Sequence, residues 1–264
     1  MTDSSPLIHP SSIIHPSAVI ADGVQVGPFS FIDEHVVIGE GSVVGPHVVI
    51  NGHTTIGKNN HFYQFCSIGE ANQDKKYKGE PTRTEIGDNN IIRESCTIHR
   101  GTIQDHQVTK IGNDNLLMAY THIAHDCQLG NHIIVANSSN LAGHVVVGDW
   151  VILGGFSGIH QFCKIGEHAF IGIRSTVTQD IMPFVLYADS AVRSVNSEGL
   201  KRRYFSADDI SLIRKAYKII FRKGFSLEQA KVELSQLSPS NISVQRMVDF
   251  INHSERGLAR GAVK

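Results

Sequence analysis

The sequence is poor in the features that mark secreted, disulfide-stabilised or membrane-spanning chains. It contains four cysteines, one tryptophan and 7% aromatic residues among 264. No apolar run approaches the roughly 20 residues that cross a bilayer. Residues 1–10 have neither the positive start nor the apolar stretch of a signal peptide. We therefore expect a cytoplasmic protein.

The cysteines lack the spacing of a disulfide framework or a metal site. Each comes four residues after a large apolar residue of the repeat described below, in a slot that elsewhere holds Ala or Ser. The four are Cys66, Cys96, Cys127 and Cys163. We predict small inward-facing side chains at these positions, rather than disulfides or metal ligands.

Charge is balanced over the whole chain but not between its two parts. The formal net charge is −1, yet residues 1–186 carry −7 and residues 187–264 carry +6. A basic C-terminal part on an acidic body favours an acidic partner or an anionic substrate at that end. A solvated helical surface is an equally good interpretation.

The dominant pattern is a large aliphatic residue at every sixth position. All twelve in-phase positions from Ile111 to Val177 are Ile, Leu or Val, and a second run extends from Ile8 to Ile68. A period of six fits neither a helix nor a plain strand. It is typical of one short strand and one corner per repeat, so that three repeats close an 18-residue triangular coil. We predict a parallel β-helix over residues 1–186, with the aliphatic residues stacked in its core.

Two interruptions and a change of period divide the chain further. The repeat fails over residues 70–85, where Asp74 and Glu80 take in-phase positions, and it slips near residues 99–110. We expect two extruded loops there, because loops on rigid scaffolds commonly carry function. From about Glu198 the pattern becomes helical, with Ser206 as a helix N-cap. Residues 187–264 are thus predicted to form a small C-terminal helical domain.

The β-helix geometry brings together residues that are distant in the sequence. Residues 18 apart stack about 4.8 Å apart in successive coils, so Gly143 lies one coil from His125 and Gln161 lies two coils away. An imidazole next to Asp126 and beside a glycine backbone is a candidate proton-transfer site. Adjacent side chains on a straight strand point apart, so the pairing of His125 with Asp126 requires a bend. A solvated histidine on a solenoid surface is the alternative.

Several segments match the pattern of one family. They are NLLM (115–118), THIAHDC (121–127), LAGH (141–144), IHQFC (159–163), GEANQDKKYKGEP (69–81), IHRG (98–101) and EGLKRR (198–203). Together they resemble the UDP-N-acetylglucosamine O-acyltransferase family of lipid A biosynthesis, over essentially the whole chain. The resemblance implies a left-handed β-helix homotrimer with a helical C-terminal domain. It also implies transfer of a 3-hydroxyacyl group from acyl carrier protein to the 3-hydroxyl of UDP-N-acetylglucosamine, the first step of lipid A biosynthesis, without an external cofactor.

The resemblance also implies roles for individual residues. His125 acts as the general base, Asp126 orients it, and the Gly143 N–H stabilises the oxyanion. Further residues are implied to bind the nucleotide sugar, its phosphates or the phosphopantetheine: Gln73, Asp74, Lys76, His122, His144, His160, Gln161, Asn196, Glu198, Arg202 and Arg203. The basic positions that suit the acidic carrier protein are Arg214, Lys215, Lys218, Arg222 and Lys223.

Two departures from the family pattern affect specificity. Position 173 is Ile, where several members have Gly at the floor of the acyl tunnel, so we expect a shorter acyl chain to be preferred. Residues 187–195 are unlike the corresponding family segment, and no contacts are carried over to them.

Three other functions compete with this prediction. A zinc-dependent trimeric β-helix hydratase would use His122, His125 and either His144 or His160 as ligands. A non-catalytic solenoid binding module would leave these histidines without a chemical role. A sister acyltransferase acting on an amine carries an additional N-terminal domain, for which a repeat beginning at Ile8 leaves no room.

Overall fold

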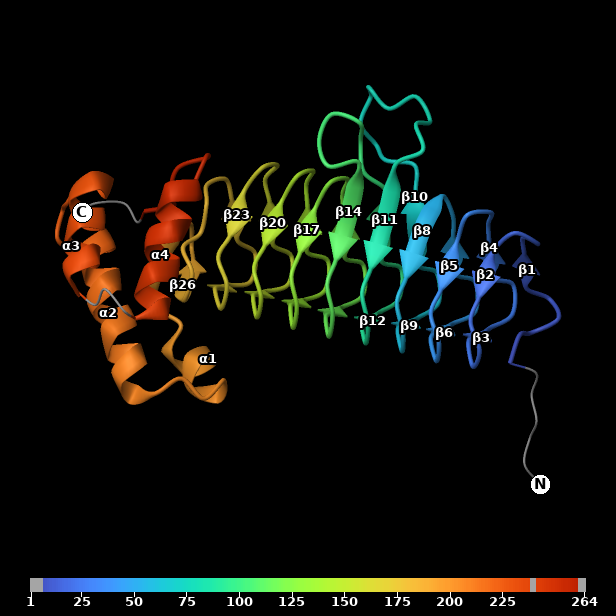
Figure 1. Cartoon of the computed structure of the whole chain (residues 1–264), viewed down its shortest axis with the longest axis horizontal. Coiled ribbons are helices and arrows are strands. Elements are labelled where there is room, and N and C mark those ends of the chain that lie inside the picture. The colour runs from blue at the N-terminus through green and yellow to red at the C-terminus, as the bar shows by residue number, and fades with distance from the viewer. Residues whose placement is uncertain (1–6, 238–240, 261–264) are drawn as a thin grey trace.

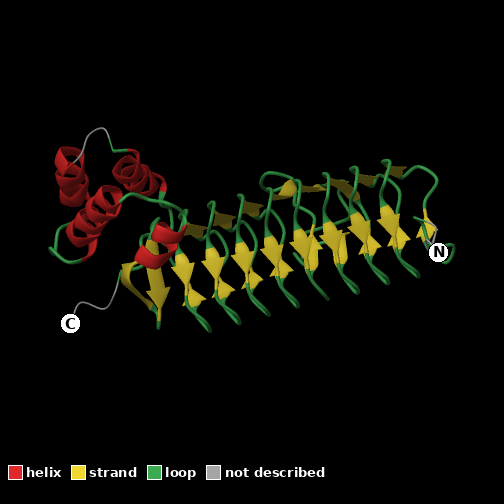
Figure 2. Ribbon diagram, turned by 90° about the horizontal axis from the view of Figure 1, so that it is seen from below, coloured by secondary structure: helices red, strands yellow, loops and turns green. Residues whose placement is uncertain are grey.

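The protein is described by a computed structural model that covers residues 7–237 and 241–260. Three parallel sheets wind into a long coil, and a group of helices lies at its C-terminal end (Figures 1 and 2). Within the described residues, no helix is both long and apolar enough to cross a membrane.

The first sheet has nine parallel strands, one from each coil. In spatial order they are β1 (Ile13–Ile14), β4 (Phe31–Ile32), β7 (Val49–Ile50), β10 (Ser67–Glu70), β13 (Thr97–His99), β16 (His122–Ile123), β19 (Asn140–Leu141), β22 (Gly158–Ile159) and β25 (Thr176–Val177).

The second sheet has eight parallel strands. They are β2 (Val19–Ile20), β5 (Val37–Ile38), β8 (His53–Ile56), β11 (Arg83–Ile86), β14 (Val108–Ile111), β17 (Gln128–Leu129), β20 (Val146–Val147) and β23 (Lys164–Ile165).

The third sheet has ten strands and ends in an antiparallel pair. They are β3 (Gln25–Val26), β6 (Val43–Val44), β9 (His61–Phe62), β12 (Ile91–Ile92), β15 (Leu116–Leu117), β18 (Ile134–Val135), β21 (Ile152–Leu153), β24 (Phe170–Ile171), β26 (Val185–Ala188) and β27 (Ala191–Val195).

The predicted repeat and its register are confirmed. Strands mostly contain two residues, and the second is the in-phase aliphatic residue that points into the core. Residues 18 apart pair across neighbouring coils, as Ile123 does with Leu141. All four cysteines are free and buried, as expected for small core side chains.

Three corners connect the sheets. The first corner joins the first sheet to the second, as in residues 124–127. The second joins the second sheet to the third, as in residues 130–133, and the third closes the coil, as in residues 136–139. At each corner one residue commonly has a positive φ, for example Asp126 (59°), His132 (56°) and Ser138 (59°). Asn, Asp and His adopt this conformation more readily than most other non-glycine residues.

Two loops extend from the first corner. β10 pairs with β13 at a separation of 30 residues, and β13 pairs with β16 at a separation of 25, instead of the usual 18. The additional residues form segments 71–82 and 100–107, which stand together on one side of the coil (Figure 1). They are joined where the Asn72 amide and the Thr82 hydroxyl both donate to the Gly101 carbonyl, at 2.9 and 2.6 Å.

Four helices follow the coil: α1 (Ser197–Arg202), α2 (Ala207–Phe221), α3 (Leu227–Leu237) and α4 (Ile242–His253). Ser206 caps α2, as its sequence predicts, by accepting from the Asp209 N–H at 3.0 Å. The expected boundary at residues 186/187 falls inside strand β26, so the third sheet extends beyond it. Beyond α4 the chain returns to the coil. There the Lys164 ammonium group donates to the Glu255 carboxylate at 2.6 Å, and Leu258 forms a parallel β-bridge with Asp180.

Candidate active site

A pocket of about 1390 Å³ lies over the first corner and the adjoining faces of the first two sheets. The two extruded loops contribute one wall, and Glu255 contributes to the edge nearest the helices. This volume is above the range of most small-ligand sites, which is typically about 300–1,000 Å³.

His125 and Asp126 form a hydrogen-bonded pair at the first corner. The distance from His125 Nδ1 to Asp126 Oδ2 is 3.0 Å. The bend that this pairing requires comes from the positive φ of Asp126, which turns its side chain back beside its neighbour. The carboxylate is fully buried and also accepts from Thr102, through the backbone N–H at 3.0 Å and the hydroxyl at 2.6 Å.

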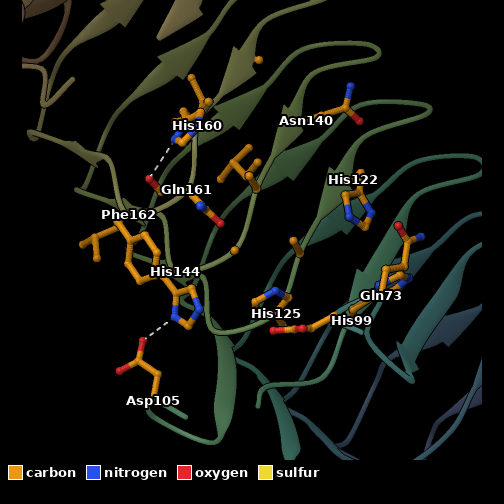
Figure 3. Close-up of a pocket in the computed structure, with 18 of the residues that line it drawn as sticks. Gln73, His99, Asp105, His122, His125, Asn140, His144, His160, Gln161 and Phe162 are labelled. Atoms are coloured by element: carbon orange, nitrogen blue, oxygen red, sulfur yellow. Dashed lines mark hydrogen bonds and ion pairs between the residues drawn. The ribbon is translucent and has the colours of Figure 1, made fainter. Parts of the chain in front are cut away.

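This environment keeps Asp126 ionised. Burial by itself raises the pKa of the carboxyl group, but hydrogen bonds from His125 and Thr102 and the nearby His144 together lower the pKa below its usual value. An ionised carboxylate can only accept hydrogen bonds, so Nδ1 of His125 carries a proton. Its Nε2 is then left as the basic atom, on a ring that lines the pocket (Figure 3).

Gly143 lies directly against the His125 ring, as the 18-residue stacking predicts. A Cβ atom added at Gly143 would lie 2.7 Å from Nε2 and closer still to Cε1. No larger residue fits there unless the imidazole moves. Within residues 7–237 and 241–260, the Gly143 N–H makes no hydrogen bond, so it is available to a ligand.

Two further histidines, His99 and His122, line the same pocket. His122 and His99 meet edge to face with ring centroids 4.8 Å apart, and His122 Nδ1 is 2.7 Å from the Thr97 hydroxyl. Burial, followed by the charges of His99 and His125, lowers the pKa of His122 to about 4. Burial also lowers the pKa of His99. Both rings are therefore neutral near pH 7. We did not predict a role for His99, although it belongs to the IHRG segment.

His144 completes the group with a partner that the sequence did not identify. Its ring stacks on Phe162 at a centroid distance of 4.3 Å and meets His125 edge to face at 4.9 Å. Asp105, from loop 100–107, lies 2.6 Å from His144 Nδ1 (Figure 3). The only sequence signal for Asp105 is its place in the second interruption of the repeat.

The other predicted residues divide into two groups. Those that line the same pocket are Gln73, Asp74, Lys76, His160 and Gln161. Those that do not line it within one chain are Asn196, Glu198, Arg202, Arg203 and Ile173.

Three residues of the second group have structural partners, and one of them, Glu198, accepts from Lys201 at 2.7 Å. Asn196 caps α1 and donates to the His168 carbonyl at 3.0 Å. Arg203 lies over the Trp150 ring at 5.1 Å and within 3.3 Å of His168 Nδ1. Ile173 is at the third corner, where 68% of its surface is exposed.

His125, Asp126 and His144 are also close enough to share a metal ion, since their donor atoms lie within 4.8 Å of one another. Each of the three already has a partner in the chain. Asp126 accepts hydrogen bonds from His125 and Thr102, and His144 is hydrogen-bonded to Asp105. This arrangement differs from the three-histidine set of the hydratase alternative.

The hexapeptide coil and its histidine–carboxylate pocket define a hexapeptide-repeat transferase, and residues 109–143 match the bacterial transferase hexapeptide model. Residues 180–259 match the model of the second domain of UDP-N-acetylglucosamine O-acyltransferase. The chain is 55% identical over 255 residues, 96% of its length and 99% of the relative's, to the acyl-[acyl-carrier-protein]–UDP-N-acetylglucosamine O-acyltransferase of Thiobacillus denitrificans. It therefore belongs to the UDP-N-acetylglucosamine O-acyltransferase family.

Solved structures agree with this assignment. The LpxA structure from Acinetobacter baumannii superposes with a TM-score of 0.94 at 49% identity, covering 97% of this chain and 100% of that one. The Francisella novicida UDP-N-acetylglucosamine acyltransferase gives 0.95 at 40% identity, covering 97% and 95%. The fold is thus the left-handed β-helix with C-terminal helices, as expected, against the right-handed rule for ordinary crossovers. The zinc hydratase alternative has no support from these relatives.

Proposed function

We propose that this acyltransferase moves an (R)-3-hydroxyacyl group from acyl carrier protein to the 3-hydroxyl of UDP-N-acetylglucosamine, the first step of lipid A biosynthesis. The observation that supports it most is the His125–Asp126 pair at 3.0 Å, with the ring packed on Gly143 inside a large pocket. The named activities of the relatives described above supply the substrates.

In this proposal His125 Nε2 acts as the general base. A thioester carbonyl is already reactive, whereas a sugar hydroxyl is a poor nucleophile until its proton is removed. His125 takes that proton as the hydroxyl oxygen attacks the carbonyl carbon, and Asp126 stabilises the imidazolium that forms. When the tetrahedral intermediate breaks its C–S bond, the same proton passes to the departing thiolate.

The charge that develops on the carbonyl oxygen needs a donor. The Gly143 N–H, which has no partner within the described residues, is the proposed oxyanion donor, because it adjoins the base. Around it, we propose that Lys76, Gln73 and Asp74 contact the nucleotide sugar, and that Gln161 contacts the uridine. The neutral His122 suits a hydrogen bond to an uncharged part of the substrate.

We propose that the chain works as a homotrimer and that a second copy completes the site. Outward positions of the third sheet are apolar from β12 to β24: Ile91, Leu116, Ile134, Ile152 and Phe170. The third corner adds exposed Phe65, Tyr120, Phe156 and Ile173. Large exposed apolar patches mark interfaces, and cyclic symmetry suits a prism-shaped subunit. Sedimentation equilibrium tests this proposal, and a monomer at micromolar concentration would contradict it.

The second copy also provides a place for the residues that lie outside the pocket of one chain. We propose that Asn196, Glu198, Arg202 and Arg203 reach the uridine diphosphate or the phosphopantetheine across that interface, and that Ile173 limits the acyl chain there. On this basis Ile173→Gly should lengthen the preferred chain in a series of 3-hydroxyacyl carrier proteins. An unchanged or shorter preference would refute the role of Ile173 without affecting the assignment of His125.

We propose that acyl carrier protein docks on α2. Five basic residues of α2 and the turn after it are exposed: Arg214, Lys215, Lys218, Arg222 and Lys223. Acyl carrier protein is acidic, so this surface suits it. A cytoplasmic location goes with the proposal, because nucleotide sugars and carrier-bound acyl chains are made in the cytoplasm.

The decisive experiment compares wild type with His125→Ala on UDP-N-acetylglucosamine and a series of 3-hydroxyacyl carrier proteins. We expect transfer by the wild type and a loss of about 10²–10⁴-fold in the variant, the usual contribution of a general base. His132→Ala is the matched control, because that histidine lies at the second corner and away from the pocket. Equal activity of His125→Ala and wild type would overturn the mechanism.

A further inference from the structure

Asp105 stands out because it is the only carboxylate that an extruded loop brings to a histidine of the pocket, among the described residues. Its Oδ2 lies 2.6 Å from His144 Nδ1, a short distance that is characteristic of hydrogen bonds with an ionised partner. The two residues are 39 positions apart in the sequence, so the contact depends on the fold of segment 100–107.

His144 has two carboxylates within reach but only one of them is available. Asp126 Oδ2 is 3.9 Å from His144 Nδ1, beyond hydrogen-bond distance. That carboxylate is already used by His125 and by both groups of Thr102. Among the described residues, the Asp105 carboxylate accepts a hydrogen bond from no side chain other than His144. Its other oxygen lies 3.5 Å from His106, whose side chain is 60% exposed.

We propose that Asp105 is a positioning residue for His144. The structure assigns one carboxylate to each of two neighbouring histidines: Asp126 to His125 and Asp105 to His144. Because a carboxylate only accepts, Asp105 requires the proton of His144 to be on Nδ1. The other ring nitrogen, Nε2, is then a hydrogen-bond acceptor for an N–H or O–H group of the substrate.

The stacking partner of His144 fixes the remaining freedom of the ring. Its plane lies 7° from that of Phe162, so stacking leaves two ring orientations related by a 180° turn about the Cβ–Cγ bond, and the Asp105 contact selects one of them. Without Asp105, the flipped orientation, with Nδ1 on the opposite edge of the ring, becomes accessible. The inference rests on the proposed function for its substrate, but the pairing itself does not.

The first measurement therefore needs no activity. In ¹⁵N-edited NMR spectra of the full-length protein without substrate, we expect the signals of His144, identified by their loss in His144→Ala, to show the Nδ1–H form. Asp105→Ala and Asp105→Asn should both shift His144 towards the Nε2–H form, because an amide can donate to Nδ1, whereas Asp105→Glu should largely keep Nδ1–H, because its carboxylate only accepts. An unchanged tautomer in Asp105→Ala would overturn the proposal.

The second measurement is a double-mutant cycle in the acyl-transfer assay. We expect Asp105→Ala to lower kcat/KM by about 10-fold, the usual scale for a hydrogen bond to a charged group. Asp105→Glu, which keeps a carboxylate, should recover most of that loss, and Asp105→Asn should not. The double variant Asp105→Ala/His144→Ala should be no worse than His144→Ala alone, because Asp105 acts through that ring. Additive losses would contradict the proposal.

The control comes from the same loop. Ile103→Ala alters an exposed side chain that does not line the pocket, so it should leave both measurements at wild-type values. If wild type transfers no acyl group from any carrier-bound donor, the proposed function fails while the NMR result still decides the pairing. If transfer depends on His125 but the His144 tautomer is the same with and without Asp105, only the proposed pairing fails.

Discussion

His144 and His168 occupy the same backbone niche in two different corners of the coil. Both have a positive φ, 63° and 57°, and both stack on aromatic rings. His144, at the first corner, meets the Asp105 carboxylate and lines the pocket. His168, at the second corner, meets the Arg203 guanidinium and is only 6% exposed.

The difference shows that the repeat places a histidine at the same backbone position twice, and that the segments packed around each histidine decide its role. At the second corner, His132, Trp150, His168 and Phe184 form a continuous stack, with centroid distances of 4.0, 6.2 and 5.7 Å. α1 and its flanking residues pack over this stack through Asn196 and Arg203. At the first corner, loops replace the helices and leave a cavity. His168 is therefore a packing residue, whereas His144 faces a cavity that can hold a ligand.

The largest effect should come from the carboxylate of the first corner. We expect Asp126→Asn to lower kcat by on the order of 10²–10⁴-fold, because an amide group does not hold the His125 tautomer. Asp114→Asn is the matched control. Asp114 occupies the corresponding niche of the second corner, with a φ of 57° and a loose 3.9 Å contact to His132. Steady-state acyl-transfer assays compare the two variants. Equal losses of kcat would contradict the proposed difference between the first and second corners.

The next effect concerns stability. His168→Ala leaves a cavity between Trp150, Phe184 and Phe205, and we expect it to lower the free energy of unfolding by about 2–4 kcal/mol. His132→Ala, at the more exposed end of the same stack, should lower it by less than about 1 kcal/mol. Urea denaturation at one fixed protein concentration compares the two variants. A larger loss of unfolding free energy in His132→Ala than in His168→Ala would show that the exposed His132 contributes more to the stability of the stack than the buried His168.

The pH dependence of stability follows from the same burial. Burial, then the charges of Arg203 and Arg246, lowers the pKa of His168 from 6.5 to about 4. The unfolded chain takes up a proton as the pH falls below about 6.5, but the folded protein does so only near 4. Stability is therefore complete above pH 6.5 and falls as the pH drops towards 4, by roughly 2–3 kcal/mol.

His122 contributes in the same pH range, since its pKa is also lowered to about 4. Urea midpoints measured from pH 7 to pH 4 should fall less steeply in His168→Phe than in the wild type, with the His122 contribution remaining. If the two pH profiles were parallel, His168 would not be the group that resists protonation.

The smallest effect should come from the cation of the second corner. Arg203→Lys keeps the charge but loses the planar guanidinium over Trp150, so we expect a loss of about 0.5–1 kcal/mol of unfolding free energy. Arg202→Lys, at the adjacent exposed position, should leave stability unchanged. A stability loss confined to Arg202→Lys would reverse the structural assignment of the two arginines.

The sequence predicted whatever depends on the period of the coil. The six-residue repeat identified the core, the buried cysteines and the approach of Gly143 to His125, because each follows from counting in steps of 18. It did not identify the bend at Asp126, which is a φ angle and not a residue type. Asp105 was missed because loop 100–107 interrupts the count, and no period extends across it.

The antiparallel strand β27 has a consequence for the molecule as a whole. A coil built from parallel strands presents at its last turn an edge that matches the next turn of any other copy. Strand β27 runs the opposite way along β26, and α1 begins two residues after it ends. Another coil cannot continue the third sheet at that end, which limits end-to-end fibre growth. Chain reversal here is thus a safeguard against polymerisation.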